Sequence, residues 1–359
     1  MENLQRSVYL LLFFFLAIGS LFYAREFLIP LALSAMLAML FVRLSNYLED
    51  KGLGRGWSAL ICVLLLVIFV AGAFTLLSYQ ISNLADNMGG IKKRLVDMLE
   101  HVKLWIYQTF GVSYQKQEQI FKEQSKANGG GSIGTFAGSF MGILVNSILV
   151  TVYIFLLLYS RDHIKQFILK LFPSDKRTKT EKVMGQSVQV AQKYLSGLSA
   201  MIVMLWIMYG IGFTIVGVEY AVFFAILCGL LEIVPFVGNI TGTSVTILAV
   251  LVQGGDGGMI LGVLITYMLV QFFQTYVLEP LVVGEQVSIN PLFTIMVIVL
   301  GEMVWGVAGM ILAIPLLGIV KIICDNVPAL KPYGFLIGSE KKKGKPGVIT
   351  RIRAIFKRT

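Results

Sequence analysis

Charged residues are scarce in this sequence. They make up 14% of the 359 residues, while hydrophobic residues make up 57% and the mean hydropathy is +0.80. Ordinary globular proteins carry roughly 25% charged residues. The apolar residues lie in long blocks rather than in a helical or strand period, which is typical of membrane proteins. This composition argues against a soluble enzyme, a secreted disulfide scaffold and a disordered chain.

Cysteine and histidine are also rare, with three and two copies. Cys62, Cys228 and Cys324 lie in or beside apolar runs, far apart in the sequence, and no CxxC pair occurs. His101 and His163 are isolated, so the spacing of a metal site is absent. We expect no metal, and we interpret the cysteines as small thiols that pack in the core.

The sequence has no GxxxxGK[ST], HExxH or GxSxG motif. Gly129, Gly131 and Gly134 form a GxGxxG pattern, but it follows no predicted strand and has no phosphate-binding lysine. We interpret it as a hinge before a membrane helix. ATP-driven transport and hydrolysis therefore lack their usual residues. We expect no enzyme activity and no cofactor, apart from a coupling ion, H⁺ or Na⁺.

The net charge of +10 belongs mainly to the C-terminal tail. From Lys331 onward there are nine Lys or Arg residues and a single acid, Glu340. Within this tail, Val348–Phe356 places basic side chains beside isoleucine and phenylalanine, which predicts a short interfacial helix attracted to anionic lipid. Basic tails that flank membrane spans usually meet lipid headgroups, so we expect no nucleic-acid partner.

Eight apolar blocks have the length needed for membrane helices or re-entrant segments, and we predict an all-α polytopic membrane protein. The first block lacks a convincing cleavage site and is interpreted as a retained helix rather than a signal peptide. The eight blocks are 8–24, 27–42, 58–79, 133–160, 198–217, 221–253, 259–278 and 291–321. The blocks 221–253 and 291–321 are broken by Pro and Gly, which is typical of irregular backbone that lines a cavity.

These blocks divide the chain into five parts. Residues 1–79 are the first three membrane helices, and 80–132 form an extramembrane helical insertion. Residues 133–197 contain the fourth membrane helix and a cytoplasmic linker, in which Pro173 and Ser174 predict a helix start. Residues 198–330 are a core with broken helices, and 331–359 are the basic tail.

Basic residues follow the second block, the fourth block and the last block, and the positive-inside rule then places both termini in the cytoplasm. Lys92, Lys93 and Arg94 fall outside in this topology, within a long loop that also contains acids and has less weight in the rule. The tail stays in the cytoplasm if the two broken blocks both cross the membrane or both are re-entrant. We therefore expect the two blocks to behave alike.

The insertion carries apolar residues at alternating spacings of four and three, which predicts a coiled-coil seam. The seam consists of Leu84, Met88, Ile91, Leu95, Met98 and Val102. One interpretation is contact between copies of the chain, and the other is packing against Ile120 and Phe121 of the same hairpin.

Several motifs lie in and around the broken blocks, in the segments 194–197, 217–221, 229–238, 279–284, 290–292, 305–315 and 331–335. Together these motifs resemble the autoinducer-2 exporter family of bacterial membrane proteins. The resemblance is dense over 185–338, whereas in the N-terminal part only the layout of the segments is similar. It implies about eight membrane segments in the bacterial inner membrane, export of autoinducer-2 or Na⁺(Li⁺)/H⁺ exchange, and a homo-oligomer, a pentamer in our interpretation.

An ionisable side chain inside a membrane segment is costly and is a functional hypothesis by default. Glu232 lies three residues before Pro235, so we expect a helix end with free carbonyl groups that help to bind a cation or a proton. Pairing that stabilises the break is the alternative. Gly238, Asn239 and Thr241 follow, at the start of a half-helix whose amides and hydroxyls suit a polar ligand. Ordinary helix capping is the alternative for these residues.

Four further polar residues complete the candidate pathway. Gln271 and Gln274 share one face of the seventh block and either line a polar path or hydrogen-bond between helices. Glu279 precedes Pro280 at the end of that block, where a carboxylate at the membrane interface costs little. Glu302 divides the last block beside Gly301.

The hypothesis from these residues is a secondary transporter. Two broken segments converge near the middle of the bilayer, hold a small polar solute or an ion, and move against the earlier helices, with Glu232 or Glu302 coupling a proton. A cation/proton antiporter on the same frame is the alternative. A scaffold that organises envelope proteins through the insertion is the second alternative.

Overall fold

The computed structural model describes residues 2–86, 133–234, 237–283 and 289–339. These residues are almost entirely helical, and the one β-type pairing among them is the bridge between Ile289 and Gly338. Most of the predicted seam, from Met88 to Val102, lies outside the described residues, as do Pro235, Gly129 and Gly131 of the predicted hinge, and the predicted tail helix. Leu84 lies in a described helix, but its side chain is not described.

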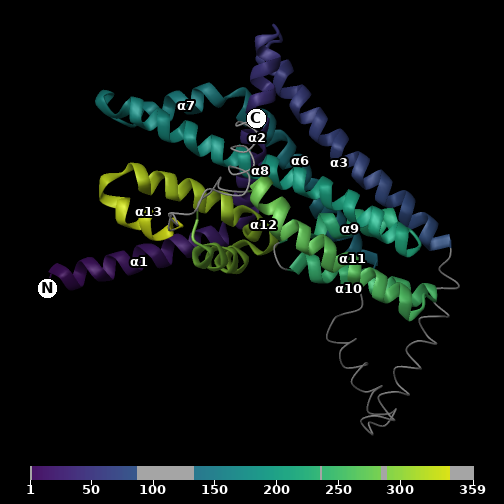
Figure 1. Ribbon diagram of the computed structural model, residues 1–359. Coiled ribbons are helices and arrows are strands. Elements are labelled where there is room, and N and C mark those ends of the chain that lie inside the picture. Colours follow the sequence, from purple (N-terminus) through teal and green to yellow (C-terminus); the bar gives the residue numbers. More distant parts are fainter. Residues whose placement is uncertain (1, 87–132, 235–236, 284–288, 340–359) are drawn as a thin grey trace, which may run out of the picture.

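The N-terminal helices are α1 (Glu2–Tyr23), α2 (Arg25–Asp50), α3 (Arg55–Asp86) and α6 (Ile133–Tyr159). Helices α2, α3 and α6 pack around small and aliphatic residues that include Ala59, Cys62 and Ile154, all fully buried. Helix α1 instead extends away from the other helices, as Figure 1 shows. Its C-terminal end is held where the Trp305 indole N–H donates to the Leu21 carbonyl at 3.0 Å.

Helix α7 (Arg161–Lys170) follows α6 after a bend of 65°, and α8 (Ser174–Val216) returns as one helix of 43 residues. The predicted helix start after Pro173 is confirmed. At 1.5 Å per residue α8 is about 65 Å long, roughly twice the ~30 Å hydrocarbon core of a bilayer. The predicted linker 161–197 is therefore α7 with the first half of α8, and its boundary at 197 lies inside a continuous helix.

The broken segment 221–253 is a helical hairpin formed by α9 (Ala221–Leu231) and α10 (Val237–Gln253). Gly238 packs against the backbone of Leu231, and a Cβ atom at Gly242 would lie 2.9 Å from the Cys228 sulfur. These contacts run in opposite order along the two helices, so α10 returns toward the end from which α9 came. With 11 residues, α9 is about 16 Å long, too short to cross a bilayer.

The hairpin is followed by α11 (Gly257–Phe273), which continues without interruption into the π-helix η1 (Gln274–Val283). The Asp256 carboxylate caps the start of α11 by accepting the Met259 backbone N–H at 2.9 Å. The π-helix turns the chain more widely than an α-helix does, and such segments are frequent at functional sites.

Helix α12 (Pro291–Asn326) also folds back on itself. Gly306 has φ of 59° and ψ of −141°, a backbone region open only to glycine. Gly301 and Gly309 consequently lie against each other, with a Cβ atom at Gly301 only 2.5 Å from the Gly309 carbonyl oxygen. In a straight helix these residues would be about 12 Å apart along the axis. Residues 291–326 are thus two antiparallel limbs.

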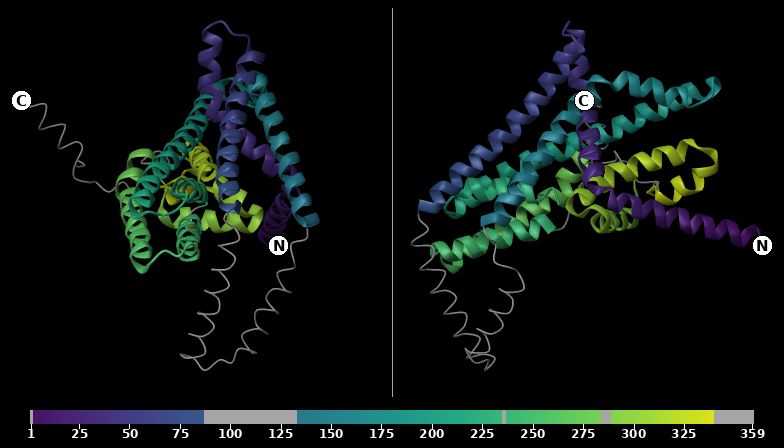
Figure 2. Two further views of the ribbon diagram at one scale, coloured as in Figure 1. Left: turned by 90° about the vertical axis from the view of Figure 1, so that its right-hand side faces the viewer. Right: turned by 180° about the vertical axis from the view of Figure 1, so that it is seen from behind.

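The chain ends beside the start of α12. After η3 (Pro328–Leu330), helix α13 (Lys331–Ile337) runs back along α12, and the Asn290 backbone N–H donates to the Ile337 carbonyl at 2.9 Å. Both broken segments therefore return, which is the paired arrangement expected from the charge distribution. The right view of Figure 2 shows the α12 limbs and α13 on one side of the molecule, away from the turn between α10 and α11.

Five helices in the described residues are long and apolar enough to cross a membrane, or six if the bent pair of α6 and α7 is counted as one span. One of the five is α12, which the contact between Gly301 and Gly309 shows to be a hairpin. The predicted all-α polytopic membrane fold with two broken segments is confirmed. We call the end that contains the α2–α3 turn, the α6–α7 bend and the start of α8 the basic end.

Candidate functional site

Polar side chains gather at the tip of the α9–α10 hairpin, where this hairpin meets α8, α11 and η1. Six residues contribute, and we call them the hairpin-tip cluster. Its members are Tyr209, Glu232, Asn239, Gln271, Gln274 and Thr275. Four of them were predicted as pathway residues from the sequence, and the structure brings these four together.

Glu232 is held at the end of α9 by a side chain from η1. The Gln274 amide nitrogen donates to Oε1 of Glu232 at 2.8 Å. Gln274 is only 2% exposed and is the first residue of the π-helix. The wider turn of η1 therefore coincides with the residue that contacts the buried carboxyl group.

The backbone around the break is partly satisfied by local hydrogen bonds. The N–H groups of Ile233 and Val234 donate to the carbonyls of Leu230 and Leu231. The Gly238 N–H donates to the Val234 carbonyl at 3.0 Å. These three carbonyls are therefore not free, and free carbonyls beside Glu232 stay a prediction.

A chain of hydrogen bonds runs across the cluster from α8 to η1. The Tyr209 hydroxyl donates to the Asn239 side-chain oxygen at 3.2 Å, and the Asn239 amide donates to the Gln271 side-chain oxygen. The Gln271 amide in turn donates to the Thr275 hydroxyl at 3.3 Å. Because Asn239 begins α10 and Glu232 ends α9, both limbs of the hairpin are tied to the same helix pair.

Three buried oxygen atoms of the α9–α10 hairpin and η1 have no hydrogen-bond partner among the described residues: Oε2 of Glu232, Oε1 of Gln274 and Oγ1 of Thr243. Thr243 lies one helical turn beyond Asn239 and is 6% exposed. An unsatisfied buried polar atom costs about 1–3 kcal/mol and calls for an explanation. Carboxylate, amide and hydroxyl oxygens suit a proton, a hard cation or the hydroxyl groups of a polar solute.

The structure leaves other predicted residues outside the cluster. Thr241 is exposed on α10, and Glu279 is exposed near the end of η1. Gly238 contributes close backbone packing rather than a polar contact. Glu302 is exposed on the first limb of α12, and within the described ranges α12 has no contact with α9, α10, α11 or η1. The two broken segments that were expected to converge therefore pack on different parts of α8.

Tyr209 and Thr275 were missed because both look like ordinary members of apolar helices. Tyr209 is 1% exposed within the membrane part of α8. A buried tyrosine hydroxyl normally has a hydrogen-bond partner. The signal that could have found Tyr209 is therefore a tyrosine in the middle of an otherwise apolar block, and Thr275 adjoins the predicted Gln274.

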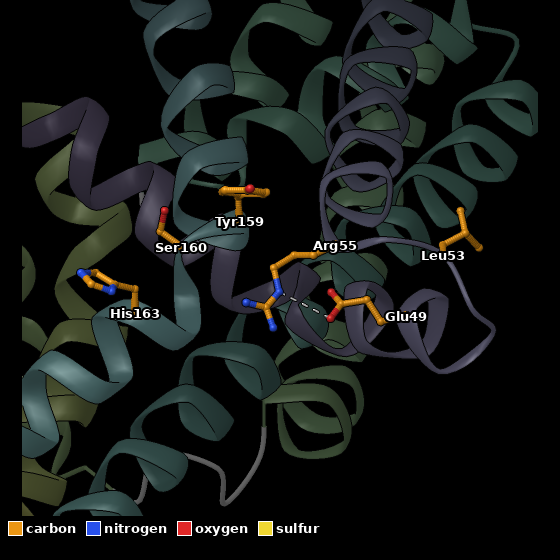
Figure 3. A pocket seen from close by; sticks show the side chains of 6 residues that line it. All are labelled: Glu49, Leu53, Arg55, Tyr159, Ser160 and His163. Atoms are coloured by element: carbon orange, nitrogen blue, oxygen red, sulfur yellow. Dashed lines mark ion pairs between the residues drawn. The ribbon is translucent and has the colours of Figure 1, made fainter.

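A second polar cavity, of about 580 Å³, lies at the basic end, between the α2–α3 turn and the α6–α7 bend. Figure 3 shows its lining, with Arg55 directed at Glu49 and His163 on the opposite wall. The charged groups here neutralise one another: Glu49 pairs with Arg161 at 2.7 Å, and Arg55 pairs with Asp162. This cavity is a junction of ion pairs that holds α2, α3 and α7 together.

The fold and the hairpin-tip cluster define a class of protein: a polytopic helical membrane protein with a buried polar site at a re-entrant hairpin. The comparisons with known proteins are more specific. The sequence profile of the AI-2E family transporter matches residues 10–329, so the chain belongs to this family.

Relatives cover most of the chain at low identity. YrrI of Bacillus subtilis (strain 168) is 22% identical over 304 residues, which are 82% of this chain and 84% of YrrI. YueF of the same organism is 24% identical over 84% of each chain. PerM of Escherichia coli (strain K12) is 23% identical over 90% of this chain and 93% of PerM. The names describe the first two as candidate transport proteins and PerM as a candidate permease, which supports a membrane transporter.

Proposed function

We propose that this protein is a secondary transporter that exports a small polar solute, similar to autoinducer-2, in exchange for an ion. The family and the names of its relatives support transport in general. The observation that carries the proposal is the buried Glu232 carboxyl group, with Oε2 unpaired among the described residues at the tip of a re-entrant hairpin. Intramembrane carboxyl groups of this kind are typical of ion and substrate pathways.

The α9–α10 hairpin is the moving part in this proposal. At the tip, polar side chains hold it to the neighbouring helices: Glu232 contacts Gln274, and Asn239 contacts Tyr209 and Gln271. Behind the tip, α9 packs on α8 through buried apolar residues such as Phe224. A solute with hydroxyl groups can replace these hydrogen bonds one for one, so that binding releases the tip from η1. Protonation of Glu232, or a cation at its free oxygen, would bias the same step.

The proposed setting follows the charge distribution and the family resemblance. The protein lies in the inner membrane of a bacterium with the basic end and both termini in the cytoplasm. The α9–α10 hairpin then enters the bilayer from the outer side and the α12 hairpin from the cytoplasmic side. Copies of the chain form a homo-oligomer, a pentamer in our proposal, in contact through the insertion 80–132.

Flux in proteoliposomes tests the assignment. Glu232→Gln keeps the shape and the hydrogen bond to Gln274 but cannot exchange a proton, so we expect at least about a tenfold loss of flux driven by a pH gradient, the effect of about 1.4 kcal/mol. Glu302→Gln is the matched control, because Glu302 is exposed and outside the cluster. If E232Q keeps the wild-type flux, the Glu232 carboxyl group does not couple transport to protons.

A Na⁺(Li⁺)/H⁺ antiporter is the second candidate, and the three unpaired oxygens of Glu232, Gln274 and Thr243 favour it. Proton flux that requires Na⁺ or Li⁺ and proceeds without an organic solute would select this function. Solute flux in the absence of both cations would select the exporter. Purified protein that moves neither class in wild-type form would leave the envelope scaffold as the better proposal.

A further inference from the structure

A cavity at the basic end is separate from the hairpin-tip cluster. It has a volume of about 790 Å³ and lies among α2, α6, α7 and α8. Cavities of roughly 300–1,000 Å³ commonly hold small ligands. Its lining runs along α2 from Ala35 to Asn46, a length of about 16 Å along the helix axis. We call this cavity the α7 groove.

The α7 groove becomes more polar along α2. There the lining changes from Ala35, Ala38 and Met39 to Arg43 and Asn46. The α8 wall is mixed, with aliphatic Val188 beside Gln189 and Gln192, and the Gln192 amide donates to the Met39 carbonyl at 2.8 Å. A cavity lined largely by aliphatic residues, with charged residues around Arg43, fits an amphiphile rather than a compact polar solute.

The charges at the mouth leave one cation unpaired. Arg161 pairs with Glu49 at 2.7 Å, and Asp162 pairs with Arg55. Lys165 pairs with Glu181 at 2.5 Å, joining α7 to α8 across the mouth. Arg43 has no ion pair or hydrogen bond with the residues that the structure describes. The groove therefore presents a single free guanidinium, which matches one negative charge.

The geometry of α7 places this mouth at the surface of the bilayer. The helix bends by 65° from α6, the predicted end of a membrane span, and exposes apolar side chains between polar ones. The exposed apolar residues here are Ile164, Phe167, Leu171 and Phe172. A short helix with this pattern at the end of a span is typical of the headgroup region, where basic pockets between membrane helices bind anionic lipid.

We propose that the α7 groove binds one anionic phospholipid. The phosphate contacts Arg43 at the mouth with help from Asn46, and one acyl chain lies against the aliphatic lining residues of α2 and α6. This site differs from the basic C-terminal tail, because it recognises the acyl chain of the lipid as well as the negative charge of its phosphate. The lipid would fix the spacing of α7 and α8 from α2 at the basic end.

Two variants test the charge and the space of the groove. Arg43→Gln removes the charge. Gly185→Leu fills part of the groove, since Gly185 lines it and a Cβ atom there meets nothing within 4 Å. The matched controls are Lys170→Gln, an exposed basic residue of α7 outside the lining, and Gly72→Leu, an equally open glycine on α3. Leucine is a better helix former than glycine, so folding should be kept in both leucine variants.

Native mass spectrometry of the full-length protein, delipidated and titrated with phosphatidylglycerol, measures the binding. We expect the wild type and both controls to retain one phosphatidylglycerol per chain, and R43Q and G185L each to weaken it about tenfold, as for the loss of a charge-assisted hydrogen bond. Phosphatidylcholine should bind about tenfold more weakly than phosphatidylglycerol to the wild type.

Three results would overturn the proposal. One is equal phosphatidylglycerol binding by the wild type, R43Q and G185L. Another is competition by glycerol phosphate as strong as that by the whole lipid, which would indicate a simple anion site. The third is a G185L variant that keeps its lipid but loses its oligomeric state, which would show that a second copy of the chain occupies the groove.

Discussion

The two helical hairpins of this protein are closed in the same way and differ at their tips. In each, a glycine of the second limb packs directly on the backbone of the first: Gly238 on Leu231 in the α9–α10 hairpin, and Gly309 on Gly301 in α12. The tip of α9–α10 carries half-buried Glu232 and buried Asn239, both hydrogen-bonded to neighbouring helices. The tip of α12 is apolar and glycine-rich, with Glu302 exposed.

This difference distinguishes two roles of a broken membrane helix, one that only returns the chain and one that also forms a binding site. Backbone packing through glycine is sufficient to return a chain within the membrane. A binding site additionally requires polar side chains that are buried and incompletely paired, and only the α9–α10 tip has them among the described residues. We therefore assign the solute or ion to α9–α10 and a structural role to α12.

The largest effects on stability should come from the glycine at which the second limb of each hairpin packs on the backbone of the first. Gly238→Ala and Gly309→Ala place a methyl group onto a backbone carbonyl that cannot move aside, and we expect each to cost about 3 kcal/mol or more. The thermal unfolding of purified protein measures this. Gly72→Ala, with open space around it, is the control and should be neutral or stabilising by up to about 1 kcal/mol.

If G238A is destabilised and G309A has wild-type stability, the two hairpins are not closed in the same way. This result would mean that the limbs of α12 are not in contact in the folded protein, and that α12 crosses the membrane as a single bent span. Wild-type stability in both variants would show that glycine packing on the backbone does not close either hairpin.

A middle-sized effect is expected from Gln274. Gln274→Leu leaves Oε1 of the buried Glu232 carboxyl without the donor that now lies at 2.8 Å, and an unsatisfied buried polar group costs about 1–3 kcal/mol. Glu302→Leu on the other hairpin removes an exposed polar group and should change stability by less than about 0.5 kcal/mol. Chemical unfolding of both variants in the same detergent checks the difference, and equal losses would contradict it.

Much of this arrangement could be predicted from the sequence. Glu232, Asn239, Gln271 and Gln274 were found because each is a polar residue in an apolar block, where its cost must be met by a partner or a function. The break after Glu232 followed from Pro235 and Gly238. The paired behaviour of the two broken segments followed from the basic C-terminal tail, which stays in the cytoplasm only if both segments cross the membrane or both return.

The rest depends on tertiary contacts that one sequence does not encode in a local pattern. Glu302 has the same signal as Glu232, an acid beside a helix break, yet α12 packs on a different part of α8 and Glu302 stays exposed. Tyr209 looks like a core aromatic until α10 places Asn239 beside it at 3.2 Å. The continuity of α8 through residue 197 was missed because its first half is charged enough to resemble a linker.

The smallest change in stability, and the sharpest test of the site, is at Thr243. Its hydroxyl is buried without a partner among the described residues, whereas the hydroxyl of Thr246, one turn along α10, donates to the Gly242 carbonyl at 2.9 Å. Thr243→Val removes an unsatisfied group, so stability should be unchanged or higher by up to about 1 kcal/mol. Flux should nevertheless fall several-fold, because the hydroxyl is kept for the solute or ion.

Thr246→Val should give the reverse pattern, a loss of up to about 1 kcal/mol with near-normal flux, because its hydroxyl already has a protein partner. Unfolding and proteoliposome flux measured on the same preparations separate the two residues. If T243V loses stability, the hydroxyl has a structural partner. If its flux stays normal, the pathway does not pass this face of α10. If both patterns hold, a residue with no stabilising contact has a role in transport, and the α9–α10 tip is a site for a ligand.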